Sequence, residues 1–508
     1  MYKDKLEKAK SLIDNLEYIK AENILRELYL SYPKNVYVAF ELGKVYFFQN
    51  NFIESRKLFF QTKNCNELAV HSMLFLAKIT IKEKKYHEAI DMLLLVKEKY
   101  GNKLEVLYEL SKLYSFLQDD KNLLSIYNEI IEIDRNNVDI KFKKFELLHK
   151  KSETIEECLF YAEELIKNQN IGIKQKNSLL NFIEYSTKNS LLKSLPQNLS
   201  VAVTGACNID CLMCTAYKSS WVLSEKTKNE IIELLPYLYN IKWLGGEPLL
   251  YKDLSRLMDI ANENNVQQHL VTNGLLLNEN IIRKIIDYNV FMQVSVDAPN
   301  KSLYEYIRKG ASFKNLLDNF ELFNKFTKNK EYHFCLNCVI LDENYKILDD
   351  IIKFAAKFNF TDVSFIMKDN TNCYSKEILS YISQNLNLYY GIANEYDIKI
   401  NSVLFEVLKK TNIKKINTEK VNNSLFCIIP WLSFCIIPPG IVTADCACSL
   451  RSLGLQEGKS IFEVWNDDNF VSYRKQIITN NFDKVCKKHC IDGVYSQHYR
   501  LTIDLRND

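Results

Sequence analysis

A chain of 508 residues is too long for one ordinary hydrophobic core, so about three domains are expected. Its hydrophobic fraction of 47% and charged fraction of 25% are typical of globular proteins and exclude a disordered or fibrous class. The 66 basic and 63 acidic side chains leave a net charge of +3, which argues against partners such as nucleic acid or an acidic membrane surface.

The N-terminal segment is charged from its third residue and has no apolar core, so we expect no signal peptide. No window approaches the run of about 18 apolar residues that a membrane span needs. We therefore expect a soluble, cytoplasmic protein. In a reducing compartment, the 14 cysteines are expected as thiols and metal ligands rather than as a disulfide framework.

The first region of the chain, residues 1–170, repeats a pattern of aromatic and small residues. The period is 34 residues, as the aromatic positions show (52 − 18 and 86 − 52). Small residues let two helices approach closely, so the pattern predicts pairs of packed helices. The positions that keep this register are Tyr18, Phe52 and Tyr86, then Ala21, Ser55 and Ala89, and then Gly43, Ala77 and Ser111.

This period resembles that of the tetratricopeptide repeat family, with about four units in the region. The resemblance implies an N-terminal helical solenoid over residues 1–170. Arrays of this family usually bind proteins or peptides in a groove. A purely structural role stays open, because a repeat pattern does not identify a ligand.

After the repeats, residues 171–197 are rich in Asn, Lys and Ser and are expected to form a polar connector. Short apolar runs then alternate with amphipathic helical segments, which predicts a parallel sheet built from right-handed βαβ units. From about Leu425 the chain is expected to be poor in strands and rich in loops. The six predicted strands are 201–205, 241–245, 268–274, 292–297, 333–341 and 362–367.

Three cysteines, Cys207, Cys211 and Cys214, follow directly on the first predicted strand in the run CNIDCLMC. Three thiolates this close together can bind one face of a cubane iron–sulfur cluster and leave its fourth iron without a protein ligand. An open metal position is typical of a catalytic site, whereas structural sites are usually closed. Three buried cysteines or a zinc site is the alternative.

This C-x3-C-x2-C run resembles the signature of the radical S-adenosylmethionine (SAM) superfamily. The resemblance implies a partial (β/α)6 barrel over residues 198–410, with a [4Fe–4S] cluster on the three cysteines. It implies that the open iron takes the amino and carboxylate groups of S-adenosylmethionine. One electron then releases a 5′-deoxyadenosyl radical that abstracts hydrogen from a substrate. An electron donor such as flavodoxin or ferredoxin is implied as well.

Further residues match this family at the ends of later strands. Gly245, Gly246 and Glu247 resemble its GGE motif, in which the carboxylate would hold the ammonium group of S-adenosylmethionine. Arg308 resembles the arginine that pairs with the cofactor carboxylate, although a solvated charge on a helix is the alternative. The other polar residues expected at the cofactor, each of which could instead cap a turn, are Thr272, Asn273, Ser295, Asp297 and Asn337.

The end of the chain offers a second set of thiols in Cys427, Cys446, Cys486 and Cys490. Four thiolates from distant loops can complete a cluster and crosslink a region with little hydrophobic core. The pattern resembles the SPASM or twitch extensions of radical SAM enzymes. It implies one auxiliary [4Fe–4S] cluster in a small cysteine-rich domain over residues 411–508.

Three points about this second site stay open. Cys448 is an alternative to Cys446 as a ligand, and Cys435 is either a spare thiol or part of the site. Zinc would also suit a tetrahedral set of four thiolates. Together the regions predict a multidomain α plus α/β protein.

The resemblance implies an enzyme of the oxidoreductase or maturase type. Enzymes of similar architecture oxidise or cross-link peptides and proteins, or dehydrogenate alcohols on sugars. The helical repeats favour a peptide, protein or carrier-bound substrate, with dehydrogenation of a sugar or small alcohol as the alternative. A non-catalytic tetratricopeptide scaffold is the alternative from another class. The sequence does not reveal the substrate, the fate of S-adenosylmethionine or the oligomeric state.

Overall fold

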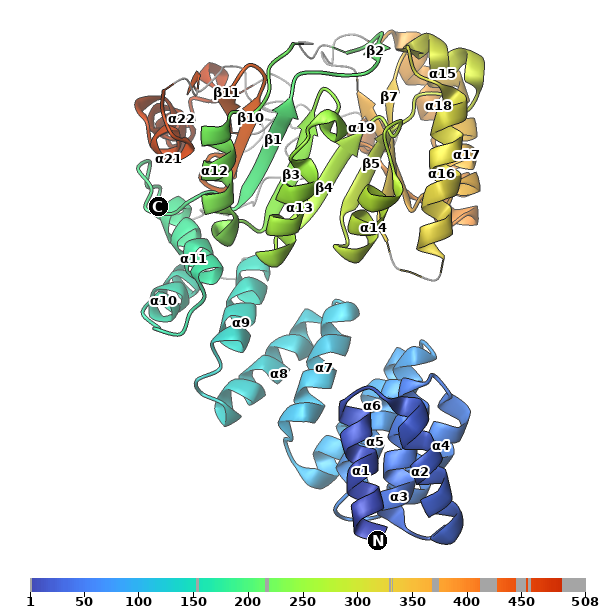
Figure 1. The fold of residues 1–508 in the computed structure, drawn as a ribbon. Helices are drawn as coiled ribbons and strands as arrows, with labels where there is room; N and C mark the ends of the chain where they lie inside the picture. Colours follow the sequence, from blue (N-terminus) through green and yellow to red (C-terminus); the bar gives the residue numbers. More distant parts are fainter. Residues whose placement is uncertain are drawn as a thin grey trace. The chain divides into compact units, whose positions relative to one another are not determined.

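The computed structural model of the chain describes residues 2–151, 155–214, 219–328, 330, 332–367, 374–411, 427–444, 454–455 and 458–486. The chain divides into two compact units, Met1–Glu153 and Thr154–Asp508 (Figure 1). Within the described ranges, no helix combines the length and the apolar character needed to cross a membrane.

The described part of the first unit consists of helices joined by short turns. Helices α2, α4, α6 and α8 begin at residues 18, 52, 86 and 120, so the 34-residue interval of the sequence (52 − 18, 86 − 52 and 120 − 86) is present in the structure. Assignment to the tetratricopeptide family stays a prediction. The helices are α1 (Tyr2–Asp14), α2 (Tyr18–Ser31), α3 (Val36–Phe48), α4 (Phe52–Thr62), α5 (Ala69–Lys82), α6 (Tyr86–Tyr100), α7 (Leu104–Phe116), α8 (Asp120–Ile133) and α9 (Val138–Lys151).

The small residues of the repeat lie where two helices meet. Ala21, Ser55 and Ala89 are fully buried. The Ser55 hydroxyl donates to the carbonyl oxygen of Gly43 at 2.8 Å. A Cβ atom at Gly43 would come within 3.0 Å of the Phe59 ring. A larger residue at these positions would force the paired helices apart.

The turn within each helix pair has one recurring geometry. Leu16, Asn50, Lys84 and Gln118 all have left-handed φ angles, of 61°, 61°, 63° and 57°. In each turn, the following N–H donates to a carbonyl five residues earlier, as Glu17 does to Leu12. This is the Schellman geometry that ends a helix. Side chains other than Gly and Asn adopt it at a cost, so the helix packing imposes this turn on Leu16.

Leu16 and Asn50 provide a matched pair for testing this cost, because both are exposed and occupy the same turn position. Leu16→Asn should raise the free energy of unfolding by about 0.5–1 kcal/mol, since Asn tolerates the left-handed region better than Leu. The reverse change, Asn50→Leu, should lower it by a similar amount. Urea unfolding followed by circular dichroism measures both. A loss of stability in Leu16→Asn would contradict the explanation.

The second unit contains one large sheet, with strand order β12-β11-β10-β1-β3-β4-β5-β7-β8-β9. From β10 through β1 to β9 every neighbouring pair is parallel, and β11 and β12 are antiparallel additions. The strands are β1 (Asn198–Thr204), β3 (Asn240–Gly245), β4 (Gln267–Thr272), β5 (Phe291–Ser295), β7 (Phe334–Ile340), β8 (Asp362–Met367), β9 (Lys399–Asn401), β10 (Ser433–Ile437), β11 (Ile441–Thr443) and β12 (Gly454–Leu455).

All six predicted strands are present, as β1, β3, β4, β5, β7 and β8, and they form a parallel sheet as predicted. Helices α12, α13 and α14 lie on one face of this sheet (Figure 1). The partial barrel stays a prediction. The helices of this unit are α10 (Ile155–Ile166), α11 (Ile173–Ser186), α12 (Glu225–Leu234), α13 (Leu254–Glu263), α14 (Glu279–Asp287), α15 (Lys301–Ile307), α16 (Phe313–Thr327), α17 (Leu348–Lys357), α18 (Lys376–Glu395), α19 (Val403–Thr411), α20 (Ile429–Leu432), α21 (Ile461–Trp465) and α22 (Asp468–Ile478).

The structure differs from the expected polar connector over residues 171–197, because this segment contains helix α11. Asn177, Asn181 and Glu184 of this helix are buried, and the two asparagines bind backbone outside the helix. Asn177 exchanges two hydrogen bonds with the backbone of Leu195, at 2.9 and 2.8 Å. Asn181 donates to the carbonyl oxygen of Trp431 at 3.1 Å. Part of the polar composition therefore reflects buried hydrogen bonding.

The structure also differs from the expectation of a strand-poor end. Residues Ser433–Ile437 form β10, which pairs in parallel with β1 on the side opposite β3 (Figure 1). The run SFCII is apolar after its serine and is almost entirely buried. Continuous apolar runs are typical of parallel strands covered on both faces.

Arg474 joins the segments around β10. It is fully buried and donates to the carbonyl oxygens of Pro430 and Trp465, both at 2.9 Å, and of Ser190 at 3.2 Å. Its guanidinium lies 4.4 Å from the centre of the Trp465 ring. The guanidinium of Arg474 thus joins three separate segments of the chain through its several N–H donors.

Replacing Arg474 by Met should lower the free energy of unfolding by about 3 kcal/mol or more, because several buried carbonyl groups lose their donor. Arg474→Lys should restore little of the lost stability, since one ammonium group cannot replace the separate N–H donors of the guanidinium. Lys475→Met, at the exposed neighbouring position, is the control and should change stability by under about 0.5 kcal/mol. Equal stabilities of the Arg474→Met and Lys475→Met variants in thermal unfolding would be inconsistent with this role.

Candidate active site at the carboxyl ends of the strands

The three-cysteine loop begins at the carboxyl end of β1. Within it, the short strand β2 (Asp210–Cys211) pairs antiparallel with β6 (Arg308–Lys309), so that Cys211 lies opposite Arg308. Cys207 and Cys211 are partly buried, and Cys214 is exposed. Parallel strands expose their carboxyl ends at a common edge, where α/β proteins bind ligands.

The glycine turn after β3 packs on the segment that leads into this loop. The N–H groups of Gly246 and Glu247 donate to the carbonyl oxygens of Thr204 and Ala206, both at 2.8 Å. A Cβ atom would lie 2.4 Å from the Thr204 oxygen at Gly245, and 2.1 Å from the Ala206 oxygen at Gly246. Gly245 also has a φ of 145°. This close backbone contact leaves no room for a side chain at either position, which explains why both residues are glycine.

Glu247 links the ends of β3 and β4. Its fully buried carboxylate accepts hydrogen bonds from the Thr272 hydroxyl at 2.7 Å and from the Asn273 N–H at 2.8 Å. Burial raises the pKa of this carboxyl, and these hydrogen bonds oppose the rise. The Asn273 amide in turn donates to Asn208 at 2.7 Å and lies 4.0 Å from the sulfur of Cys207.

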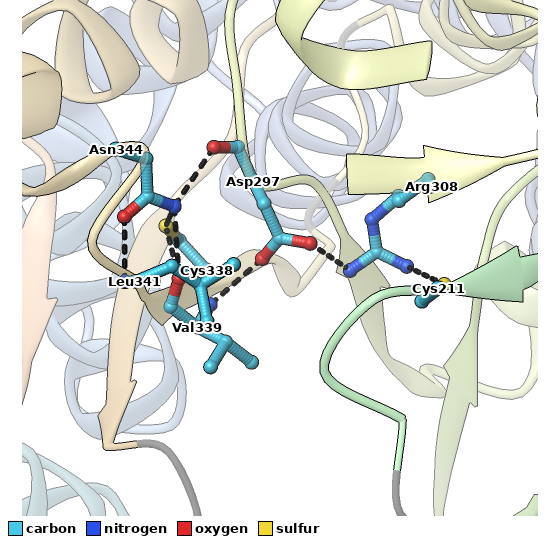
Figure 2. Close-up of polar contacts among 7 residues, drawn as sticks. All are labelled: Cys211, Asp297, Arg308, Cys338, Val339, Leu341 and Asn344. Atoms are coloured by element: carbon cyan, nitrogen blue, oxygen red, sulfur yellow. Dashed lines mark hydrogen bonds and ion pairs between the residues drawn. The ribbon is translucent and has the colours of Figure 1, made fainter. Parts of the chain in front are cut away.

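A second polar network joins the ends of β5 and β7 to Cys211 (Figure 2). Arg308 and Asp297 form a buried ion pair, with Nη2 and Oδ2 2.7 Å apart. The other end of the guanidinium, Nη1, donates to the Cys211 sulfur at 3.6 Å. Arg308 is only 5% exposed, so its interpretation as a solvated helix charge is wrong.

Asn344, which the sequence did not point to, holds this network in place. Its fully buried amide donates to the carbonyl oxygens of Asp297 and Val339, at 3.0 and 2.9 Å. The N–H of Val339 donates to Asp297 Oδ1 at 2.8 Å (Figure 2). In the sequence, Asn344 is only an asparagine shortly after a predicted strand, and an asparagine that caps a turn has the same pattern.

Ser295 and Asn337 lie opposite each other where β5 pairs with β7. Asn337 is buried, and its Oδ1 accepts from the Cys335 thiol at 3.6 Å. The cofactor-contacting residues predicted from the sequence therefore lie on neighbouring strands or at their ends. Their contact with S-adenosylmethionine stays a prediction.

The second set of cysteines is only partly described. Cys427 is partly buried and Cys486 is buried, whereas Cys446, Cys448 and Cys490 lie outside the described residues. Cys435 is fully buried on β10, opposite Ser200 of β1. Where the structure describes the chain, no three His, Cys, Asp or Glu side chains surround a single ion site.

The surroundings of Cys211 fit a ligand of a cubane cluster, and the spread of the three thiols is no obstacle. Such a cluster binds each thiolate to a different iron, so its ligands need not converge on one point. Burial raises the pKa of Cys211, while the Arg308 cation lowers it. A guanidinium donor beside a ligand sulfur suits a thiolate better than a thiol.

Residues 201–355 match the family model of the Radical SAM superfamily. The chain contains a radical SAM domain. Such a domain implies a [4Fe–4S] cluster and S-adenosylmethionine as cofactors. The match begins within β1 and includes the cysteine loop, the glycine turn and the Asp297–Arg308 pair.

Proteins similar to this chain include the Radical SAM cyclopropyl synthase TigE of Paramaledivibacter caminithermalis. It is 25% identical over 310 residues, which cover 58% of this chain and 64% of TigE. The Mycofactocin maturase MftC of Mycolicibacterium smegmatis is 27% identical over 175 residues, covering 33% and 43%. The chain thus spans less than two thirds of either relative. The crystal structure of Streptococcus suis SuiB bound to precursor peptide SuiA aligns with a TM-score of 0.44 and 15% identity, covering 66% of this chain and 83% of SuiB.

The backbone contact at Gly246 predicts that even a small side chain at this position is destabilising. Gly246→Ala should lower the free energy of unfolding by about 2 kcal/mol or more, because its methyl group would overlap the Ala206 carbonyl. It should also reduce the iron bound by the cysteine loop after anaerobic reconstitution. Gly391→Ala in helix α18 is the control, since a Cβ atom there meets open space. That change should raise stability by about 0.5–1 kcal/mol. Full stability and iron content in Gly246→Ala would refute the explanation.

Proposed function

We propose that this chain is a radical SAM enzyme that modifies a peptide, protein or carrier-bound substrate. The observation that carries the proposal is the loop of Cys207, Cys211 and Cys214 at the carboxyl end of β1, with a buried cationic donor on the middle sulfur. A scaffold without catalytic function would not need a buried charge at this place, because burying it is costly.

In this proposal the three cysteines hold a [4Fe–4S] cluster. When bound, the cluster and S-adenosylmethionine supply reductive cleavage of a carbon–sulfur bond and a radical that removes hydrogen from the substrate. Glu247 offers a buried carboxylate to the cofactor ammonium and is already oriented by Thr272 and Asn273. Ser295 and Asn337, on adjacent strands, line the same edge of the sheet.

One observation supports a substrate larger than a free metabolite. The helical unit has a hollow of about 420 Å³ bordered by α7, α8 and α9, with Leu123 and Tyr127 beside Lys143. A mixed apolar and charged hollow suits a peptide side chain.

We also propose an auxiliary [4Fe–4S] cluster on Cys427, Cys446 or Cys448, Cys486 and Cys490. Support comes from the anchoring of the segments that carry two of these cysteines. Arg474 on α22 binds the carbonyl of Pro430, three residues after Cys427, and α22 leads toward Cys486. The segments are therefore joined by a fixed buried contact.

Iron and sulfide analysis after anaerobic reconstitution tests both clusters. The unmodified chain should bind about eight irons, and the triple change of Cys207, Cys211 and Cys214 to Ala should retain about four. The triple variant should also lose the formation of 5′-deoxyadenosine from S-adenosylmethionine under reducing conditions. Unchanged iron in the triple variant would exclude the proposed ligands. About four irons in the unmodified chain would exclude the auxiliary cluster alone.

A further inference from the structure

The backbone brings Arg308 and Cys211 together. Strands β2 and β6 place the two residues opposite each other, and the N–H of Leu212 donates to the Ile307 carbonyl at 2.9 Å. The guanidinium is almost fully buried. The pairing therefore places Arg308 directly opposite Cys211, and the guanidinium contacts the sulfur (Figure 2).

The opposite side of the guanidinium is fixed by Asp297, which has no exposed surface. Asp297 is itself held by the Val339 N–H, and its carbonyl by the Asn344 amide. Asp297 Oδ2 binds Nη2, whereas Nη1 faces the sulfur. The positive end of this ion pair is thus directed at Cys211 and its negative end away from it.

Such a directed ion pair acts on the electrons of a metal centre. Donors to a ligand sulfur withdraw electron density, and a nearby positive charge favours the more negative, reduced state of a cluster. Both effects are strong where water is excluded.

We propose that Arg308, oriented by Asp297, is a positioning residue that fixes the Cys211 thiolate and raises the reduction potential of the cluster bound there. The inference rests on the proposed function, since it needs a cluster at Cys207, Cys211 and Cys214. It assigns the guanidinium to a ligand sulfur, where the family resemblance alone had assigned it to the cofactor carboxylate.

EPR-monitored redox titration of the reconstituted full-length chain tests this inference. The signal of this cluster is identified as the one that the triple Cys→Ala variant lacks. Arg308→Gln should shift its midpoint to lower potential while iron content stays at the parent level. Lys309→Gln is the matched control, because it removes the same charge from the exposed neighbouring residue of β6, and it should leave the midpoint unchanged.

A second variant guards against loss of folding, because Arg308→Gln leaves Asp297 buried without its partner. The double change Arg308→Gln with Asp297→Asn removes both charges, so that no carboxylate stays buried without its partner. It should also lower the midpoint, since the donor that faces the sulfur is gone. A midpoint in the double variant equal to or above that of the parent would overturn the inference. Absence of this signal from the unmodified chain would instead overturn the proposed function.

Discussion

The strand that carries the cysteine loop is held on both of its edges, and the rest of the site depends on this. β1 pairs in parallel with β3 on one side and with β10 on the other. Its end is also in direct backbone contact with the Gly245–Gly246 turn. The strand that leads to Cys207 is therefore fixed by a neighbouring strand on each side. Precise placement of this kind is what a metal site needs from its scaffold.

From this fixed strand, two buried polar networks reach the cysteine loop. One passes from Glu247 through Asn273 toward Cys207, and the other passes from Asp297 through Arg308 to Cys211. Each joins the ends of different strands, so the order of the parallel sheet determines which side chains can meet. Burial of these charges is tolerable only because each is paired or hydrogen-bonded.

The sequence predicted most of the sheet, because alternation of apolar runs with amphipathic segments reports burial directly. It failed for α11, whose Asn177 and Asn181 are polar yet buried, and composition alone cannot distinguish the two situations. It also missed β10, since the surrounding cysteines suggested a loop-rich metal site. Of the site, the types and approximate places of the residues were predictable. The burial of Arg308 and the role of Asn344 were not, because both depend on contacts between separate elements.

Because β10 pairs with β1, the sheet does not end where the family match ends. Residues 201–355 contain the radical SAM match, but one edge of β1 is covered only by a strand that begins at Ser433. That strand is in turn anchored through Arg474 to Ser190, ahead of the domain. A fragment cut at the domain limits would leave a long apolar edge open to self-association. The sheet of the second unit therefore extends beyond the residues of the family match, because β10 covers an edge of β1 that the matched residues leave open.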